Sequence, residues 1–385
     1  MKTDKLDINY DLKSMESWSI WNPIVPKTTC SFNETPDGIL VASPDKPYAV
    51  GGIYQETKGI KGGFSYAIKV DCKIKDVPYP YRTVFVRLTW TNDGAPIHYA
   101  GMLIRGPIID GDNARFDDVI VAPDEANGVV ISLDVKWLEG GSVVWKNASI
   151  NETDPIPPRK VKIGTVFFRP SNSTPENNLR LWCEKIDEAG KLGLDIVCLG
   201  EAITMIGTSA NAVDCAYPIP GHDTDILGNS ARKNKIWVVA GLSELDEDII
   251  YNTAVLLDRE GKVAGKYRKV HLPREEWKWG ITPGHEYPVF QTDFGIVAMQ
   301  ICYDWFFSEP EEIFALNGAE IIFAPTWGNT LPDHDGIADG ETVFRVRARD
   351  NGVYMVPSVY DGNSLIIDPM GRILASNNGK EGVFW

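Results

Sequence analysis

The sequence has little of what metal sites and disulfide scaffolds require. Its 385 residues include only five histidines and six cysteines, and the cysteines form no CxxC pair. This spacing predicts no zinc site. Scattered cysteines in a chain of this length favour a reducing compartment over a disulfide framework.

The sequence also lacks an excess of positive charge and a long hydrophobic run. Lysine and arginine number 38 against 53 aspartates and glutamates, which gives a net charge of −15. This balance argues against nucleic acid or an anionic membrane surface as the main partner. No apolar run approaches the length of a membrane span, and the first 20 residues are too polar for a signal peptide. We therefore expect a cytoplasmic protein.

The length predicts two domains, and the first, residues 1–150, has a period of two. In "FSYAIKVDCKIK" and "VISLDVKW" apolar residues alternate with small or polar ones. Such alternation places apolar side chains on one face of a half-buried strand. Glycine and proline clusters separate these strands and no helix is indicated, so we expect an antiparallel β-sandwich. The residues expected to face its core are Phe64, Tyr66, Ile68, Val70, Cys72, Ile74, Ile131, Leu133, Val135 and Trp137.

A different pattern begins after a polar, proline-rich segment, 151–160, which we interpret as a linker. In residues 161–385, short continuous apolar runs alternate with helical patterns. Thr174 and Pro175, for example, are typical of a helix cap followed by a proline in the first turn. This alternation predicts an α/β domain whose strands are covered on both faces.

Three reactive side chains each follow an apolar run in this second domain. Glu201 follows "DIVCLG", Lys269 follows "GKVAGKYRK" and Cys302 follows "GIVAMQI". In α/β folds, functional groups gather where strands end. A thiolate is a nucleophile, a nearby ammonium lowers the pKa of the thiol, and a carboxylate can transfer its proton. The ammonium and the backbone N–H of Tyr303 can stabilise an oxyanion.

Each of these residues also has an ordinary interpretation. A cysteine that ends an apolar strand is usually a buried small side chain, as we expect for Cys198. A glutamate at a strand end often caps a helix, and Lys269 lies in the basic cluster "KYRKVH". Asp304 is expected to cap the segment that follows it. Spacing alone does not decide between these interpretations and catalysis.

Longer motifs favour catalysis. The segments "GLDIVCLGEA", "YNTAVLLDREGKVAGKYRKVHLP" and "FGIVAMQICYDWFFSEPEEIFALNGAEIIFAPT" occur in this order, followed by "RARDNGVYMVPSVYDGNSLIIDPMGRILA". From Arg159 to nearly its end, the chain resembles the nitrilase superfamily of carbon–nitrogen hydrolases. The resemblance implies a four-layer α-β-β-α sandwich, preceded here by the all-β sandwich. It also implies a Glu201–Lys269–Cys302 triad that hydrolyses an amide, a carbamoyl amide or a nitrile through a thioester.

The same resemblance implies no metal or organic cofactor, a small-molecule amide or carbamoyl substrate, and a homo-oligomer. A second glutamate is expected between Lys269 and the Pro283–Gly284 turn. Glu275 and Glu276 are both available, and Glu276 matches the family better. Family members usually continue beyond the final "KEGVFW", so we expect the sequence to be truncated at its C-terminus.

Residues that follow the triad positions are the candidates for the substrate pocket. They are Ile203, Thr204, Trp277, Trp279, Trp305, Trp327 and Asn329. One of Arg345, Arg347 and Arg349 could bind a substrate carboxylate, as an N-carbamoyl amino acid would require; salt bridges within the fold are their alternative role. The "ICYDWFFSEP" run favours an amidase or N-carbamoyl amidohydrolase over a nitrilase.

The first domain leaves an alternative function open. Its segment "GGIYQETKGIKGGFSYAIKV" loosely resembles jelly rolls of the carbohydrate-binding type, although aromatic residues on a sandwich are more often part of the core. A carbohydrate could therefore be a partner of this domain. In the alternative, the protein binds a glycan or another partner and the hydrolase-like half is a scaffold.

Overall fold

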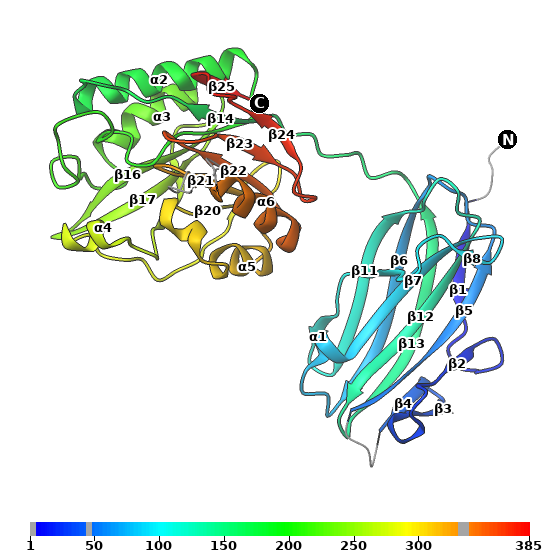
Figure 1. The fold of residues 1–385 in the computed structure, drawn as a ribbon. Helices are drawn as coiled ribbons and strands as arrows, with labels where there is room; N and C mark the ends of the chain where they lie inside the picture. The colour runs from blue at the N-terminus through cyan, green and yellow to red at the C-terminus, as the bar shows by residue number, and fades with distance from the viewer. Residues whose placement is uncertain (1–4, 44–47, 330–338) are drawn as a thin grey trace. The chain divides into compact units, whose positions relative to one another are not determined.

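The computed structural model describes residues 5–43, 48–329 and 339–385. The chain divides into two compact units, an N-terminal unit, Met1–Pro158, and a C-terminal unit, Arg159–Trp385 (Figure 1). Each unit has its own hydrophobic core.

The N-terminal unit consists of two antiparallel sheets with a shared core. The larger, seven-stranded sheet has the order β10 (Ile108–Asp110), β11 (Asn113–Val121), β6 (Ser65–Lys75), β13 (Ser142–Thr153), β4 (Gly38–Ala42) and β3 (Ser31–Thr35), with β1 (Asp7–Tyr10) also paired to β13. The six-stranded sheet has the order β2 (Ser19–Trp21), β5 (Ala49–Lys58), β12 (Gly128–Leu138), β7 (Val84–Asn92) and β8 (Ala95–Pro96), with β9 (Met102–Leu103) also on β7. The helical segments described in this unit are the single turns η1 (Pro26–Thr28) and α1 (Pro80–Thr83).

The predicted alternation of buried and exposed side chains is present along most of β6 and β12 and fails at Phe64 and at Trp137. Alternate residues of β6, from Tyr66 to Ile74, are buried, whereas Phe64 precedes the strand and is exposed. In β12, the register shifts between Val135 and Leu138. Trp137 lies in this bulge with a φ of 56° and is 46% exposed, while Leu138 is buried. The prediction that Trp137 faces the core is wrong because the extra residue of a bulge changes which side chains point inward.

The predicted linker, 151–160, begins too early. Strand β13 continues to Thr153, and residues Asn151–Thr153 pair with Ala67, Tyr66 and Ser65 of β6. The prediction relied on the polar composition of this segment. Polar residues can still pair in a sheet, because the hydrogen bonds between strands join backbone groups.

The C-terminal unit contains two six-stranded sheets. The first has the order β18 (Val263–Arg268), β17 (Ile249–Leu257), β16 (Trp237–Asp246), β15 (Ile196–Cys198), β14 (Ile163–Phe167) and β25 (Gly382–Phe384). The second has the order β19 (Phe290–Gln291), β20 (Ile296–Met299), β21 (Ile321–Pro325), β22 (Tyr354–Ser358), β23 (Leu365–Ile367) and β24 (Ile373–Ser376). Strands β14, β15 and β16 are parallel to one another, as are β20, β21 and β22.

Alternate side chains of the central strands belong to two different cores, which defines the layers. Val239 of β16 packs in the core shared with the second sheet, whereas its neighbours Val238 and Ala240 pack under α2 (Pro175–Lys191) and α3 (His222–Asn234). Helices α5 (Glu309–Leu316) and α6 (Asp339–Asn351) cover the other side, through residues such as Phe314 and Phe344 (Figure 1). The predicted four-layer α-β-β-α sandwich is confirmed.

Helix α2 begins as the sequence predicts. The Thr174 side chain accepts a hydrogen bond from the backbone N–H of Asn177 at 3.2 Å, and Pro175 occupies the first turn. Trp182 and Ile186 lie on the buried face of the helix. No helix in the described ranges is long and apolar enough to cross a membrane. All six cysteines are free thiols.

Glu311 is a buried carboxyl group inside the C-terminal unit. It lies on α5 without exposed surface, accepts a hydrogen bond from Gln300 Nε2 at 2.9 Å and lies 3.7 Å from Arg347 Nε. Burial raises the pKa of Glu311 from 4.5 to about 8. Between these two values the folded state holds the proton more tightly than the unfolded state, so the contribution of Glu311 to the free energy of unfolding falls as the pH rises.

We expect Glu311→Gln to gain thermal stability relative to the wild type as the pH rises through this range, because the amide cannot ionise. Thermal denaturation of both proteins at pH 5, 6.5 and 8 measures the difference. Glu312→Gln, which changes the exposed neighbour on the same helix, is the control and should give a small, pH-independent shift. A difference in melting temperature between Glu311→Gln and the wild type that stays constant across the three pH values would show that Glu311 is ionised in the folded state.

Candidate active site

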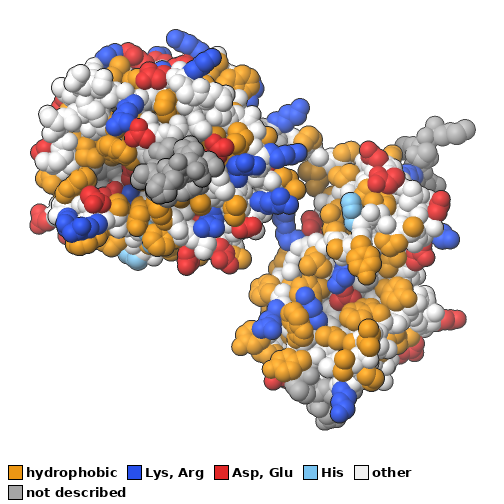
Figure 2. All heavy atoms as spheres, viewed as in Figure 1, with side chains coloured by type: hydrophobic (Ala, Val, Ile, Leu, Met, Phe, Trp, Pro, Cys, Tyr) orange, Lys and Arg blue, Asp and Glu red, His pale blue; other side chains and the backbone are white. Residues whose placement is uncertain are grey.

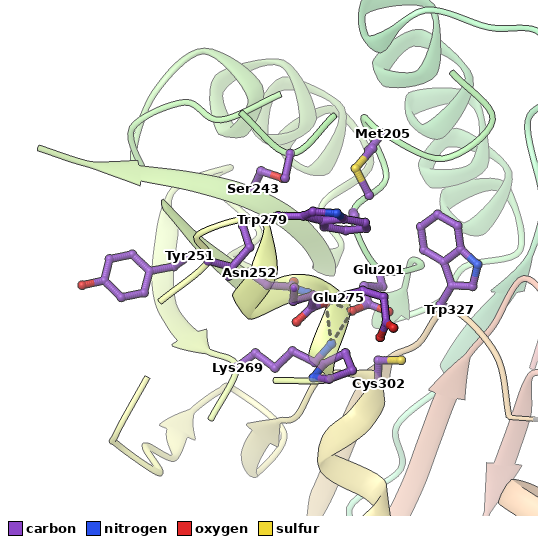
Figure 3. A pocket seen from close by; sticks show the side chains of 15 residues that line it. Glu201, Met205, Ser243, Tyr251, Asn252, Lys269, Glu275, Trp279, Cys302 and Trp327 are labelled. Carbon is purple, nitrogen blue, oxygen red and sulfur yellow. Dashed lines mark hydrogen bonds and ion pairs between the residues drawn. The ribbon is translucent and has the colours of Figure 1, made fainter. Parts of the chain in front are cut away.

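A cavity of about 340 Å³ brings together side chains from both sheets of the C-terminal unit (Figure 3). Glu201 follows β15 and Lys269 follows β18, both in the first sheet, whereas Cys302 follows β20 of the second. All three line the cavity together with Glu276 of α4 (Arg274–Lys278). The four residues lie beyond the ends of strands, where loops replace the regular sheet.

Lys269 lies at the centre of a compact hydrogen-bond network. Its ammonium donates to Glu201 Oε1 at 2.9 Å and to Glu276 Oε1 at 2.8 Å, and its side chain is 1% exposed. Asn252 Nδ2 donates to the same two oxygens, at 2.8 and 2.9 Å. Two carboxylates are thereby held side by side in a buried site.

The electrostatics follow from this arrangement. Burial opposes the charge of Lys269, but the neighbouring carboxylates Glu201 and Glu276 outweigh burial and raise the pKa of the ammonium. Burial raises the pKa of Glu276, and the repulsion from Glu201 adds to it, while Lys269 counteracts both. Lys269 is therefore a permanent cation.

Cys302 begins the short helix η2 (Cys302–Phe306) with a φ of 42°, in the left-handed region. It is partly exposed and lines the cavity together with Glu201, Lys269 and Trp327. Burial raises the pKa of the thiol, Glu201 raises it further, and Lys269 only partly offsets them. The expectation that Lys269 brings this pKa towards neutrality is wrong. The raised pKa indicates a neutral thiol, with Glu201 in the same cavity available to accept its proton.

Asp304 holds the turn that carries Cys302. Its buried carboxylate accepts hydrogen bonds from the Ile301 backbone N–H at 2.9 Å, the Tyr267 hydroxyl at 2.8 Å and the His271 backbone N–H at 2.9 Å. The ring Nδ1 of His271 lies 2.9 Å from the same carboxylate. Asp304 thus connects the cysteine turn to the segment that carries Lys269.

The tryptophans predicted for the pocket separate into two groups. Trp327 and Trp279 line the cavity (Figure 3). Trp305 belongs to the core, is only 3% exposed and stacks on the exposed Phe306, whereas Trp277 is 56% exposed and does not line the cavity. Trp305 and Trp277 therefore lie outside the cavity wall, contrary to the prediction. The sequence does not show on which side of a short turn a side chain lies.

The other predicted binding residues have structural contacts. Asn329 is fully buried and exchanges side-chain hydrogen bonds with the backbone of Asn363, at 3.0 and 3.1 Å. The ring of Tyr303 packs against Phe306 and Phe307. Ile203 and Thr204 are buried outside the cavity wall, which is formed instead by their neighbours Ala202 and Met205.

The sequence analysis missed several residues that line the cavity. They are Ala202, Met205, Ala212, Ser243, Tyr251, Asn252, Pro273 and Ile281. Asn252 could have been found from the hairpin formed by "YNTAVLLDREGKVAGKYRK". In this hairpin Thr253 pairs with Arg268, and the Lys269 N–H donates to the carbonyl oxygen of Asn252, so that Asn252 lies opposite the catalytic lysine. Both Glu275 and Glu276 line the cavity, and of these two it is Glu276 that contacts Lys269.

No group of three or more His, Cys, Asp or Glu side chains within the described residues is arranged to hold a metal ion. The cavity carboxylates Glu201 and Glu276 converge on the Lys269 ammonium instead. This arrangement can accept a proton from the thiol and stabilise a developing negative charge beside it.

We expect Asp304→Ala to lower the free energy of unfolding by about 3 kcal/mol, because it leaves buried N–H and O–H donors unpaired. Urea denaturation measures the loss. Asp248→Ala, at an exposed turn, is the control and should change stability by less than about 0.5 kcal/mol. Equal stability of the two variants would contradict the structural role of Asp304.

The chain was compared with known proteins. Residues 162–384 match the family described as carbon-nitrogen hydrolase. A nitrilase of Pyrococcus abyssi is 33% identical over 235 residues, which cover 57% of this chain and 86% of that protein. The omega-amidase NIT2 of Mus musculus is 30% identical over 233 residues, covering 56% and 83%.

Among solved structures, Saccharomyces cerevisiae Nit3, a member of branch 10 of the nitrilase superfamily, is similar to this chain. It has a TM-score of 0.52 and 27% identity, and the match covers 60% of this chain and 91% of Nit3. The family match spans more than half of the chain, and the fold and the order of the motifs agree with it. The chain belongs to the carbon–nitrogen hydrolase family, within the nitrilase superfamily.

Proposed function

We propose that the C-terminal unit hydrolyses the C–N bond of an amide or N-carbamoyl amide through a thioester on Cys302. One observation carries the proposal: Cys302, Glu201 and the buried Lys269, whose ammonium donates to Glu201 at 2.9 Å, line one cavity large enough for a small molecule. The names of two relatives, a nitrilase and an omega-amidase, agree with a hydrolase of this class.

In the first half of the reaction, Glu201 accepts the thiol proton as the sulfur attacks the amide carbon. Lys269 and the backbone N–H of Tyr303, which lies in the first turn of η2, stabilise the oxyanion that forms. Glu201 then returns its proton to the nitrogen, the C–N bond breaks, ammonia leaves, and an acyl group stays on Cys302. A base beside a neutral thiol suits this sequence, since the thiolate is needed only during the attack.

In the second half, water takes the place of ammonia. Glu201 accepts a proton from the water as the oxygen attacks the thioester carbon, and the proton is transferred to sulfur when the C–S bond breaks. One amide and one water thus give one carboxylic acid and one ammonia. Glu276 and Asn252 hold Glu201 and Lys269 in position through the four hydrogen bonds described above.

Two unpaired acceptors in the cavity wall favour an amide over a nitrile. Asn252 Oδ1 and Glu276 Oε2 are buried and have no hydrogen-bond partner in the described part of the chain. Buried acceptors without a partner are costly, and a substrate NH₂ group could supply the missing donors. A nitrile carries no N–H and cannot do so.

We expect the wild type to release ammonia from amides in a coupled ammonia assay, and both Cys302→Ala and Glu201→Gln to lower kcat/KM by at least about a thousandfold, since each removes a group that acts in every step. Cys183→Ala removes the other partly exposed thiol and serves as the control, with near wild-type activity. Ammonia release by Cys302→Ala at the wild-type rate would refute the thioester. No release from any amide, carbamoyl amide or nitrile by the folded wild type would favour the scaffold alternative.

The N-terminal unit supports carbohydrate binding as a second candidate function. Its exposed Trp137 is held in a left-handed conformation that is rare for a bulky residue. Lys136 Nζ lies 4.7 Å from the indole centre and Arg82 lies 5.4 Å from it. Figure 2 shows further hydrophobic side chains interspersed with lysines and arginines on the visible face of this unit. Both cations lie over the face of the ring, so a sugar that stacks on Trp137 would displace at least one of them. Assembly into a homo-oligomer and a cytoplasmic location stay predictions of the sequence.

On a glycan array we expect the wild type to bind a subset of glycans and Trp137→Ala to lose most of this signal, because the stacking surface is removed. Tyr99→Ala, at a fully exposed position of the same unit, is the control and should bind as the wild type does. Absence of binding by the wild type, or equal binding by Trp137→Ala, would contradict this second function.

A further inference from the structure

The described residues that line the cavity include no free cation that could bind a substrate carboxylate. Among the described residues that line it, Lys269 is the one cationic side chain, and both Glu201 and Glu276 already accept hydrogen bonds from it. Arg345, Arg347 and Arg349 do not line the cavity. Arg345 Nε donates to the carbonyl oxygen of Gly371 at 2.9 Å, and Arg347 Nε lies 3.7 Å from the buried Glu311 carboxyl group. The undescribed residues 330–338 contain no lysine or arginine.

The wall instead carries a carboxylate that the hydrolytic steps leave unused. Glu275 lines the cavity (Figure 3) and is exposed, and it has no ion-pair partner within the described ranges. A carboxylate at this position repels a substrate anion and attracts an ammonium group. Because Glu275 is exposed, water screens the effect to at most about 1 kcal/mol.

The rest of the wall is apolar and extends beyond the catalytic cavity. Ala202, Met205, Ala212, Trp279 and Ile281 form much of it. An adjoining hollow of about 380 Å³ shares three of these residues, and its lining is Met205, Ala210, Asn211, Ala212, Val213 and Trp279. An apolar acyl chain can therefore continue along Met205 and Trp279 away from Cys302, and each buried CH₂ group contributes about 0.8 kcal/mol.

We propose that the substrate is a primary amide with an extended apolar acyl chain whose far end is neutral or carries an amine, and that Glu275 selects against a carboxylate at that end. The inference rests on the proposed function of the same cavity and narrows it. It excludes N-carbamoyl amino acids and monoamides of dicarboxylic acids as the preferred substrates, because none of the described cavity residues offers a free cation to their carboxylate.

Three amides of similar length test the charge preference: hexanamide, 5-aminopentanamide and 4-carbamoylbutanoate, whose far ends are neutral, cationic and anionic. We expect kcat/KM for the first two to exceed that for the third by at least tenfold, and hexanamide to exceed acetamide because the acyl chain is buried. Glu275→Gln should lower the ratio of kcat/KM for 5-aminopentanamide to that for 4-carbamoylbutanoate by about threefold or more, since the carboxylate attracts one end group and repels the other. Glu260→Gln, at an exposed turn, should leave the ratio as in the wild type.

The outcomes separate this inference from the proposed function. Fastest hydrolysis of 4-carbamoylbutanoate, abolished by Cys302→Ala, would overturn the substrate class and leave the thioester proposal intact. If none of the amides is hydrolysed, isothermal titration calorimetry of the wild type with the same three compounds still reports binding. Tighter binding of the neutral and cationic amides than of the anion would support the inference, and equal affinity for all three would overturn it.

Discussion

The site depends on the buried ammonium group of Lys269. Two carboxylates cannot be held side by side in a buried position without opposite charge, because burial and mutual repulsion would protonate one of them. The ammonium between Glu201 and Glu276, with Asn252 donating to the same oxygens, makes this arrangement possible. A buried ion pair of this kind adds little net stability, but the loss of one partner is strongly destabilising. Its role is therefore to fix the positions and charges of the groups around it.

The neutral state of Cys302 follows from the same electrostatics. A preformed thiolate reacts with oxidants and alkylating agents whether or not substrate is present. Here burial and the neighbouring Glu201 raise the pKa of the thiol, so the proton leaves only when a carbon atom is in place for attack. The arrangement combines a reactive residue with protection of that residue between turnovers.

The sequence predicted the parts of the fold and site that depend on local pattern. Short stretches of sequence were enough to predict the strand periodicity, the Thr174 cap and the three strand-end residues. The order of the long motifs then indicated that the three strand-end residues belong to one site. The errors concern side-chain direction. Trp137 is turned outward by one additional residue in a strand, and Trp305 and Trp277 lie in short helices whose orientation is set by packing. Asn252 was missed because its role depends on the strand opposite.

The origin of the catalytic residues in different layers has a further consequence. Glu201 and Lys269 follow strands of one sheet and Cys302 follows a strand of the other, so the distance from base to nucleophile equals neither a loop length nor a strand register. It is set by the separation of the two sheets, which depends on the size of the core side chains between them, such as Val239 and Phe323. Catalytic alignment tolerates shifts of only fractions of an ångström. Substitutions in this interior are thus constrained by the chemistry at its edge as well as by folding, although neither Val239 nor Phe323 lines the cavity.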